Sequence, residues 1–214
     1  MIKIDLFVFD LDGTLADTGQ DIAAAVNHTL EKLGMATLEH KRIMNYVGDG
    51  VQELIRRSLG TDHHYALAEA LTVFSAYYGE HMLDKTALYP GVEECLAHFA
   101  GKKKMVISNK KHEFTVKIVK SLGIAHYFDD IIGGDFRPYL KPDARLVDHY
   151  LDHYHIPREK AAIVGDGHND ILLAKNAGII SCAFLNGFGE RQRLLALRPD
   201  VTCENLAELK NIFC

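Results

Sequence analysis

Two aspartates near the N-terminus are the clearest candidates for chemistry in this sequence. Asp10 and Asp12 follow a largely apolar run at residues 4–9 and precede a turn glycine, Gly13. Carboxylates placed so close together repel each other, and this costs stability unless a cation binds them. A divalent cation is the obvious ligand. The spacing therefore indicates a metal site, at which a carboxylate can also serve as a nucleophile.

The other polar candidates stand at three later points in the chain: Ser108 with Asn109, Lys141, and Asp166 with Asp170. Each group comes at or shortly after the end of a predicted strand. Because the carboxyl ends of parallel strands in an open α/β sheet converge on one crevice, we expect these side chains to meet the first pair of aspartates there. The combined set suits a hard, oxygen-ligated cation such as Mg²⁺ with a phosphate beside it.

Charge balance favours a cation at this site. A carboxylate and a phosphate oxygen about 4 Å apart repel by about 4 kcal/mol per unit charge pair at an effective dielectric of about 20. A nucleophilic aspartate therefore needs a cation that bridges it to the phosphoryl group, and Lys141 could neutralise a second oxygen.

The chain has two regions that differ in their predicted secondary structure. Residues 18–83 carry only helical patterns, at 18–33, 39–46, 50–59 and 62–83, with Thr18 as the N-cap of the first and Gly34 as its stop. Strands are predicted at 4–9, 104–108, 130–133, 161–165, 181–185 and 200–203, with helices at 91–100, 113–122, 142–154, 168–177 and 190–196. This alternation predicts a Rossmann-like α/β fold, a doubly wound parallel sheet. The predicted core domain comprises residues 1–16 and 87–214, and an all-α cap domain of residues 17–86 is inserted into it.

The polar segments resemble the four motifs of the haloacid dehalogenase superfamily, in the order of that family. The DxDGT motif is Asp10-Leu11-Asp12-Gly13-Thr14, the second-motif residue is Ser108, the third-motif lysine is Lys141, and the GDxxxD motif contains Asp166 and Asp170. The inserted helices are similar to the cap of the first subclass of the family. Closure of such a cap would exclude water and select the substrate.

The resemblance implies a role for each motif residue. Asp10 would be the nucleophile, and Asp12 the general acid and base that protonates the leaving alkoxide and then activates water against an aspartyl-phosphate. Mg²⁺ would bind Asp10, the backbone carbonyl of Asp12, and Asp166, with Asp170 nearby, directly or through water. The phosphoryl group would be held by Ser108, Asn109 and Lys141.

Within the superfamily, Asp12 favours phosphate transfer, because the relatives that cleave carbon–halogen or carbon–phosphorus bonds lack this second aspartate. The segment Gly48-Asp49-Gly50 resembles the glycine loop in the cap of phosphoglycolate phosphatases, and Arg57 stands where those enzymes often carry an arginine. We therefore expect a phosphoric monoester hydrolase, with 2-phosphoglycolate as the first substrate to try. Three alternatives stay open: an inorganic pyrophosphatase, a phosphotransferase similar to β-phosphoglucomutase, and a receiver-like phosphoacceptor module.

Composition constrains the partners and the compartment. The chain has 214 residues and a net charge of −5, which gives no reason to expect nucleic acid or an anionic membrane as a partner. Four cysteines without CxxC spacing are typical of a reducing cytosol, and aspartates interrupt the apolar run that a secretory signal needs. We expect a cytoplasmic protein, monomer or homodimer, that binds a small phosphorylated metabolite. His149 and His153 lack the HExxH context of a zinc site and are expected to lie on an exposed helix face.

Overall fold

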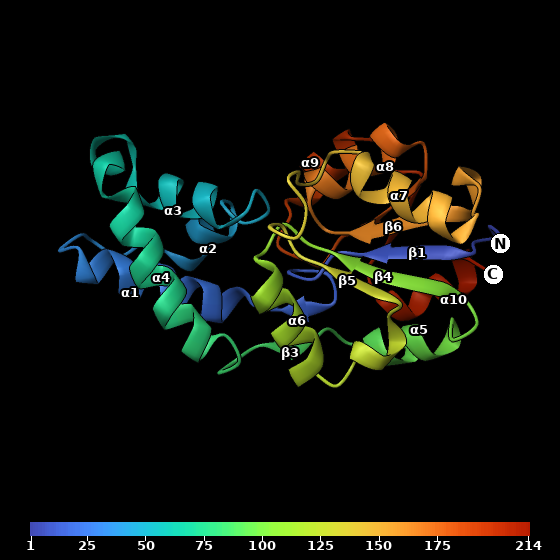
Figure 1. Ribbon diagram of the computed structural model, residues 1–214, viewed down its shortest axis with the longest axis horizontal. Coiled ribbons are helices and arrows are strands. Elements are labelled where there is room, and N and C mark those ends of the chain that lie inside the picture. Colours follow the sequence, from blue (N-terminus) through green and yellow to red (C-terminus); the bar gives the residue numbers. More distant parts are fainter.

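The computed structural model describes residues 1–214, and its centre is a six-stranded parallel sheet with the order β5-β4-β1-β6-β7-β8 (Figure 1). The chain runs outward from β1 through β4 to β5 and then returns to the opposite side of β1. The strand order thus reverses beside β1, the switch point at which doubly wound sheets bind ligands. The strands are β1 (Leu6–Phe9), β4 (Lys103–Ile107), β5 (Asp130–Ile132), β6 (Ala161–Gly165), β7 (Ile180–Phe184) and β8 (Val201–Cys203).

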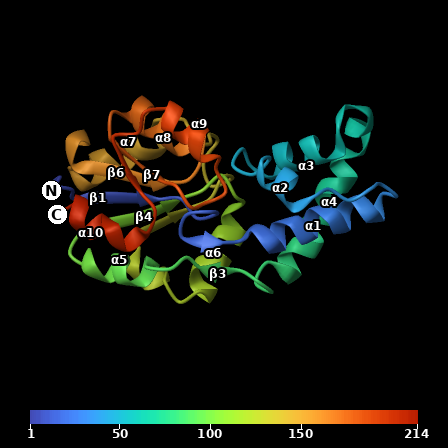
Figure 2. The ribbon, with the colours of Figure 1, turned by 180° about the vertical axis from the view of Figure 1, so that it is seen from behind.

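Helices cover both faces of this sheet, as Figures 1 and 2 show. Successive side chains of β1 point to opposite faces. Leu6 and Val8 belong to one apolar cluster with residues of α7 and α8, and Phe7 and Phe9 belong to another with residues of α5 and α6. All four side chains are fully buried, which explains the continuous apolar run of this strand. The flanking helices are α5 (Val92–His98), α6 (His112–Ser121), α7 (Arg145–Tyr154), α8 (His168–Ala177), α9 (Arg191–Ala196) and α10 (Leu209–Ile212).

A helical lobe lies beyond the carboxyl ends of the strands (Figure 1). Its helices are α1 (Gly19–Lys32), α2 (His40–Met44), α3 (Val51–Leu59) and α4 (Leu67–His81). The two segments that connect the lobe to the sheet pair as short antiparallel strands, β2 (Ala16–Asp17) and β3 (Ala87–Leu88). Buried Asp21 at the start of α1 accepts hydrogen bonds from the backbone N–H groups of Lys85 (3.0 Å) and Thr86 (2.9 Å). The outgoing and returning segments are therefore tied together at two places.

The predicted doubly wound sheet is confirmed, and most predicted elements lie within a few residues of the observed ones. The single helix predicted at 62–83 is wrong. A 3₁₀ helix at Thr61–Ala66 precedes α4, and the φ of His63 is −119°, outside the helical range. Thr, Asp and His are poor helix formers, so the local sequence does not carry the helix through this segment. The strands β2 and β3 were not predicted, because two residues are too few to show alternation.

Three smaller features concern the rest of the molecule. His149 and His153 are exposed on α7, as predicted. The four cysteines are free thiols, and the Sγ atoms of Cys182 and Cys203 lie 3.9 Å apart on neighbouring strands. None of the helices combines the length and the apolar character that crossing a bilayer requires.

Candidate active site

Neighbouring strands bring the predicted polar residues together at one edge of the sheet. Asp10 follows β1, Ser108 follows β4 and Asp166 follows β6, and β4, β1 and β6 are adjacent. Lys141 comes from the loop between β5 and α7, and Asp170 lies in the first turn of α8. The four segments singled out in the sequence therefore converge at the switch point of the sheet.

A buried lysine joins two of the carboxylates. The Nζ atom of Lys141 lies 2.8 Å from Oδ1 of Asp10 and 2.7 Å from Oδ1 of Asp170. The Lys141 side chain is only 2% exposed, so these ion pairs are shielded from water. Backbone N–H groups complete the contacts: Leu11 donates to Oδ1 of Asp10 at 2.7 Å, and Gly167 donates to Oδ2 of Asp170 at 2.9 Å. The orientation of each carboxylate is therefore fixed by more than one partner.

Asp166 is held against the turn that follows β1. The Thr14 hydroxyl donates to Oδ1 of Asp166 at 2.7 Å, and the backbone N–H of Phe188 donates to Oδ2 at 2.8 Å. Gly13 makes this approach possible, because its φ is +81° and a Cβ atom there would lie 2.2 Å from Oδ2 of Asp166. The glycine of the first motif therefore serves two purposes: it allows a left-handed turn and it leaves room for the carboxylate.

Three carboxylates form a cluster suited to a metal ion. Asp10, Asp166 and Asp170 can each offer one oxygen, and these atoms lie within 4.8 Å of one another. Burial, reinforced by the charge of Asp170, raises the pKa of Asp166 to about 6. Burial raises the pKa of Asp10 as well. The charge of Lys141 opposes this rise, and the charges of Asp170 and Asp166 add to it. A cation would relieve the repulsion, and an all-oxygen donor set fits a hard cation such as Mg²⁺.

Asp12 has a different set of partners from Asp10. Its Oδ1 atom accepts a hydrogen bond from the Thr18 hydroxyl at 2.6 Å, and its Oδ2 atom lies 3.2 Å from Nζ of Lys110. Lys110 also donates to the hydroxyl of Tyr78, a residue of α4, at 2.9 Å. Thr18 stands at the N-cap position of α1, but its side chain makes no capping hydrogen bond, because its hydroxyl donates to Asp12 instead. Asp12 is thus held between the sheet and the helical lobe.

Asn109 positions the loop that carries the buried lysine. Its Oδ1 atom accepts from the backbone N–H of Lys141 at 2.8 Å, and its Nδ2 group donates to the carbonyl of the same residue at 3.1 Å. The Nδ2 group also donates to the carbonyl of Gly48 in the helical lobe at 2.9 Å. Ser108 beside it is 4% exposed, and its Oγ atom accepts from the backbone N–H of Lys110 at 3.3 Å.

The glycine loop at residues 48–50 contacts the sheet side of the site. Asn169 of α8 donates to Oδ1 of Asp49 at 2.7 Å, and Nη2 of Arg57 lies 2.5 Å from Oδ2 of the same carboxylate. Gly48 and Gly50 both have positive φ values, +121° and +85°, which favour glycine. The four lobe residues predicted from the sequence therefore gather near the site. Arg57 meets the loop through Asp49.

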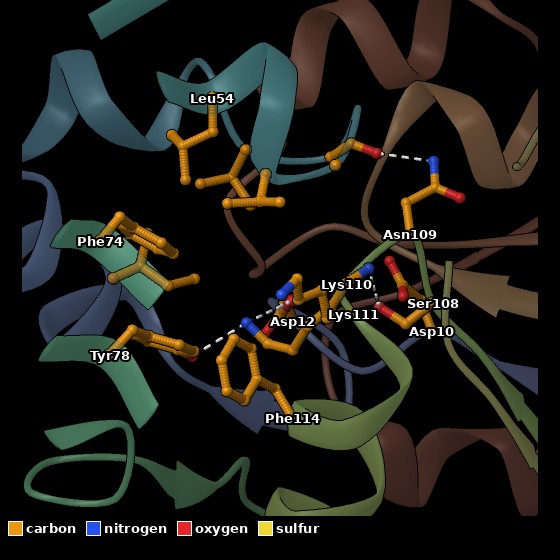
Figure 3. Close-up of a pocket in the computed structure, with 15 residues that line it drawn as sticks. Asp10, Asp12, Leu54, Phe74, Tyr78, Ser108, Asn109, Lys110, Lys111 and Phe114 are labelled. Carbon is orange, nitrogen blue, oxygen red and sulfur yellow. Dashed lines mark hydrogen bonds and ion pairs between the residues drawn. The ribbon is translucent and has the colours of Figure 1, made fainter. Parts of the chain in front are cut away.

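A cavity of about 60 Å³ lies between the lobe and the sheet. Figure 3 shows Asp10, Asp12, Ser108 and Lys110 on one side of it and the apolar side chains of Leu54 and Phe74 on the other. Its lining consists of Asp10, Asp12, Ile22, Val47, Gly48, Gly50, Val51, Leu54, Phe74, Tyr78, Ser108, Asn109, Lys110, Lys111 and Phe114. Both aspartates of the first motif therefore reach a space with a polar floor and a largely apolar roof.

A second cavity, of about 420 Å³, shares the two aspartates of the first motif with the smaller one. It also contains Asp166, Arg57 and His168, but neither Ser108 nor Asn109. The two cavities thus differ in which part of the site they adjoin. The smaller one borders the second-motif residues, and the larger one borders the fourth motif.

Comparison with known proteins identifies the family. The sequence model of the haloacid dehalogenase-like hydrolase family matches residues 7–184, and the chain belongs to this family. It is 34% identical to a phosphoglycolate phosphatase of Vibrio parahaemolyticus over 98% of this chain and 96% of that protein. It is 36% identical to a phosphoglycolate phosphatase of Neisseria meningitidis over 96% of this chain and 92% of that protein. These findings confirm the superfamily expected from the four motifs and make the protein a hydrolase.

Solved structures are similar over the whole chain. A crystal structure described as that of a predicted phosphoglycolate phosphatase from Haemophilus somnus superimposes with a TM-score of 0.91 at 27% identity, covering 98% of this chain and 97% of that one. A haloacid dehalogenase-like hydrolase of Streptococcus pneumoniae gives a TM-score of 0.88 at 28% identity, covering 99% of both chains. The similarity therefore includes the helical lobe as well as the sheet.

Four residues of the site were not predicted to contribute to it: Thr14, Thr18, Tyr78 and Lys110. Two of them had a signal in the sequence. Thr14 belongs to the first motif, and Lys110 directly follows the second-motif pair Ser108-Asn109. Thr18 was assigned only to a helix cap. No local pattern marks Tyr78, because its contact with Lys110 depends on how α4 lies over the sheet.

Proposed function

We propose that the protein is a Mg²⁺-dependent phosphatase that hydrolyses a small phosphorylated metabolite, with 2-phosphoglycolate as the first substrate to test. The observation that supports this most strongly is the buried ammonium of Lys141, which lies between the carboxylates of Asp10 (2.8 Å) and Asp170 (2.7 Å). It places a fixed positive charge next to a carboxylate at the switch point of the sheet, where a phosphoryl group can be bound and attacked. The phosphatase relatives support the choice of reaction and of substrate.

In this proposal the two aspartates of the first motif have separate roles. A carboxylate oxygen of Asp10 forms a bond to phosphorus while the bond between phosphorus and the leaving oxygen breaks. Asp12 gives its proton to that leaving oxygen. Water then attacks the aspartyl-phosphate, loses a proton to Asp12 and releases phosphate, which restores both carboxyl groups. The separate hydrogen-bond partners of Asp10 and Asp12 are consistent with this division.

The remaining motif residues would hold the phosphoryl group and the metal. Ser108, Asn109 and Lys141 would bind the transferring phosphoryl oxygens. Mg²⁺ would be held by Asp10, the backbone carbonyl of Asp12, and Asp166, with Asp170 as a further acidic neighbour. When bound, the cation would offset the repulsion between the carboxylates and the phosphate. The oxygen atoms of the acidic cluster, within 4.8 Å of one another, fit such an ion.

We further propose that residues 17–86 act as a cap domain on a core of residues 1–16 and 87–214. The loop of Gly48, Asp49 and Gly50 contacts the core through Asn109 and Asn169, so it can cover a bound substrate and exclude water. The volume of the smaller cavity, about 60 Å³, supports a short leaving group. The compartment that fits the free thiols is the cytoplasm.

The test is phosphate release by the purified protein from a panel of phosphate esters, with 2-phosphoglycolate, hexose phosphates and pyrophosphate included. We expect hydrolysis of a small ester with Mg²⁺ and none above background with a chelator. Asp10→Asn should abolish turnover. Asp5→Asn, before the same strand, should retain it because the Asp5 carboxylate pairs with Lys102 and Lys160, away from the site. Turnover that survives Asp10→Asn or chelation would refute the mechanism. Preference for pyrophosphate, or a stable label on Asp10, would indicate one of the alternative functions instead.

A further inference from the structure

Lys110 is a buried cation that the proposed phosphoryl transfer does not use. Its side chain is 8% exposed, and its Nζ atom lies 3.2 Å from Oδ2 of Asp12. The hydroxyl of Tyr78 accepts a hydrogen bond from it at 2.9 Å, and the ammonium also lies 4.5 Å from the centroid of the Tyr78 ring. Because an ammonium has three N–H donors, at least one remains for a ligand in the cavity that Lys110 lines.

The other cations near the site have less to offer a ligand in this cavity. Lys141 does not line this cavity, and the proposed function assigns it to the phosphoryl group. Arg57 is paired with Asp49 and does not line the smaller cavity. Lys111 lines it, but its side chain is 37% exposed and lies 3.6 Å from Glu113, so solvent and a neighbouring acid weaken its field. Lys110 is therefore the buried positive charge available beside Asp12 (Figure 3).

Lys110 lies next to the residue that would protonate the leaving group of the substrate. If Asp12 protonates the leaving oxygen, that oxygen must lie within hydrogen-bond reach of the carboxyl group, about 2.6–3.2 Å. Lys110 is itself 3.2 Å from the same carboxyl group, so an atom two bonds beyond the leaving oxygen can come within reach of its ammonium. In a 2-hydroxy acid phosphate, the atom two bonds beyond that oxygen is the carbon of a carboxylate.

The apolar lining of the rest of the cavity means that a bound carboxylate needs a cationic partner such as Lys110. Leu54, Phe74 and Phe114 line it with apolar surface, and a carboxylate placed against them without a partner would lose its hydration uncompensated. The cavity is about 60 Å³, and a longer leaving group would have to extend into the adjoining cavity of about 420 Å³, which Lys110 does not line. A short alcohol with one negative charge next to its oxygen fits both the size and the charge.

We propose that Lys110 determines substrate specificity by binding a carboxylate carried next to the leaving oxygen of the substrate. This inference rests on the function proposed above and deepens it, because it assigns the recognition of an anionic leaving group to one residue. Tyr78 would hold the ammonium in place from the helical lobe, so that the cation is correctly positioned only when α4 covers the site.

The experiment compares two substrates that differ in the charge of the leaving group. One is 2-phosphoglycolate, and the other is 2-hydroxyethyl phosphate, in which a neutral hydroxyl replaces the carboxylate. We expect Lys110→Met to lower kcat/KM for 2-phosphoglycolate by about 10- to 100-fold, the range of a hydrogen bond to a charged group, and to change the neutral ester much less. Lys110→Arg should keep the preference. Lys120→Met, an exposed position on α6, the helix that follows Lys110, should match the wild type.

A readout without turnover uses glycolate itself. Glycolate should raise the melting temperature of the wild type and of Lys110→Arg, but not that of Lys110→Met. If Lys110→Met does not fold, Lys110→Gln, which keeps a donor for Tyr78, serves in its place. Equal losses on the two esters would mean a structural role and would overturn the inference while leaving the proposed function intact. A wild type that hydrolyses neither ester, yet cleaves other phosphate esters, would overturn the proposed substrate and this inference with it.

Discussion

The Nζ atom of Lys141 lies 2.8 Å from Oδ1 of Asp10, although the two residues come from distant parts of the chain. The contact joins a loop after β5 to the end of β1, and Asn109 fixes the backbone of that loop at 2.8 Å. The charge of a buried lysine is costly unless carboxylates surround it, and the carboxylates are costly unless a cation does. Each group therefore stabilises the other in the folded protein.

Removal of this lysine should weaken both stability and activity. Lys141→Met leaves Asp10 and Asp170 buried without a cation, so we expect a loss of about 3 kcal/mol or more in the free energy of unfolding at pH 8 without metal. The rate should fall by about 100-fold or more, as for loss of a preorganised donor. Lys160→Met is the control, since Lys160 forms an exposed pair with Asp5 at 3.3 Å and should change stability by less than about 1 kcal/mol. Urea unfolding and phosphate release measure the two effects, and equal behaviour of the variants would contradict the assignment.

The raised pKa values predict how pH and Mg²⁺ act together on stability. Asp166 has a pKa of about 6 in the folded protein, above its ordinary 3.8. The metal-free folded state therefore binds more protons than the unfolded chain between about pH 4 and pH 6, and the free energy of unfolding falls as pH rises through this window. The raised pKa of Asp10 extends the fall to higher pH.

Because Mg²⁺ binds the ionised carboxylates, its effect should increase as pH rises. We expect millimolar Mg²⁺ to change the melting temperature little at about pH 5 and to raise it by several degrees at about pH 8. Thermal unfolding at four pH values, with MgCl₂ or with a chelator, measures the difference. Asp166→Asn should flatten both trends. A Mg²⁺ shift of the same size at every pH would show that these carboxylates are not the groups that titrate.

The core and its strand ends could be predicted from the sequence because the signals are local. The buried run of β1 and the polar residues that follow β1, β4 and β6 all appear in short windows, and the convergence of parallel strands then places them together. The interpretation of Asp10, Lys141 and Asp170 as neighbours needed only that rule. Their distances could not be predicted, because they depend on the loop that Asn109 positions.

The contacts across the lobe could not be predicted for a different reason. Tyr78 reaches Lys110 only because α4 lies over the carboxyl edge of the sheet. How a helix packs against a distant part of the chain cannot be predicted from a short stretch of sequence. Thr18 shows a related failure. A threonine at a helix start is normally a cap, yet here its hydroxyl donates to Asp12, so a tertiary contact replaced the local one.

The neighbouring arginines of α3 provide a matched test of the glycine loop. Arg57 holds Asp49 at 2.5 Å, whereas Arg56 contacts only Glu53 on its own helix at 2.7 Å. Both side chains are about one-third exposed or more, so their ion pairs contribute at most about 1 kcal/mol. We expect Arg57→Ala to raise KM by about 2- to 5-fold with little change in kcat, and Arg56→Ala to leave both constants unchanged. Steady-state kinetics measure both constants. If Arg57→Ala also left both constants unchanged, the contacts of Asp49 with Asn169 and His168 would be sufficient to hold the loop.

Two glycines with similar φ values allow the effect of backbone strain to be distinguished from the effect of a close contact. Gly13 (φ +81°) would place a Cβ atom 2.2 Å from Oδ2 of Asp166, whereas Gly34 (φ +71°) has nothing within 4 Å of such an atom. Gly34→Ala should therefore cost only the left-handed backbone strain, about 1 kcal/mol, and leave activity unchanged.

Gly13→Ala carries the same strain and must also displace the Asp166 carboxylate, so we expect a loss of about 3 kcal/mol in stability and of about 100-fold or more in activity. Chemical unfolding and phosphate release, measured side by side for the two variants, separate the contributions. If Gly13→Ala behaved like Gly34→Ala in both, the turn after β1 would tolerate a side chain and Asp166 would not need its close contact with the first motif. If instead Gly13→Ala lost activity but not stability, the contact would matter for the position of the carboxylate alone.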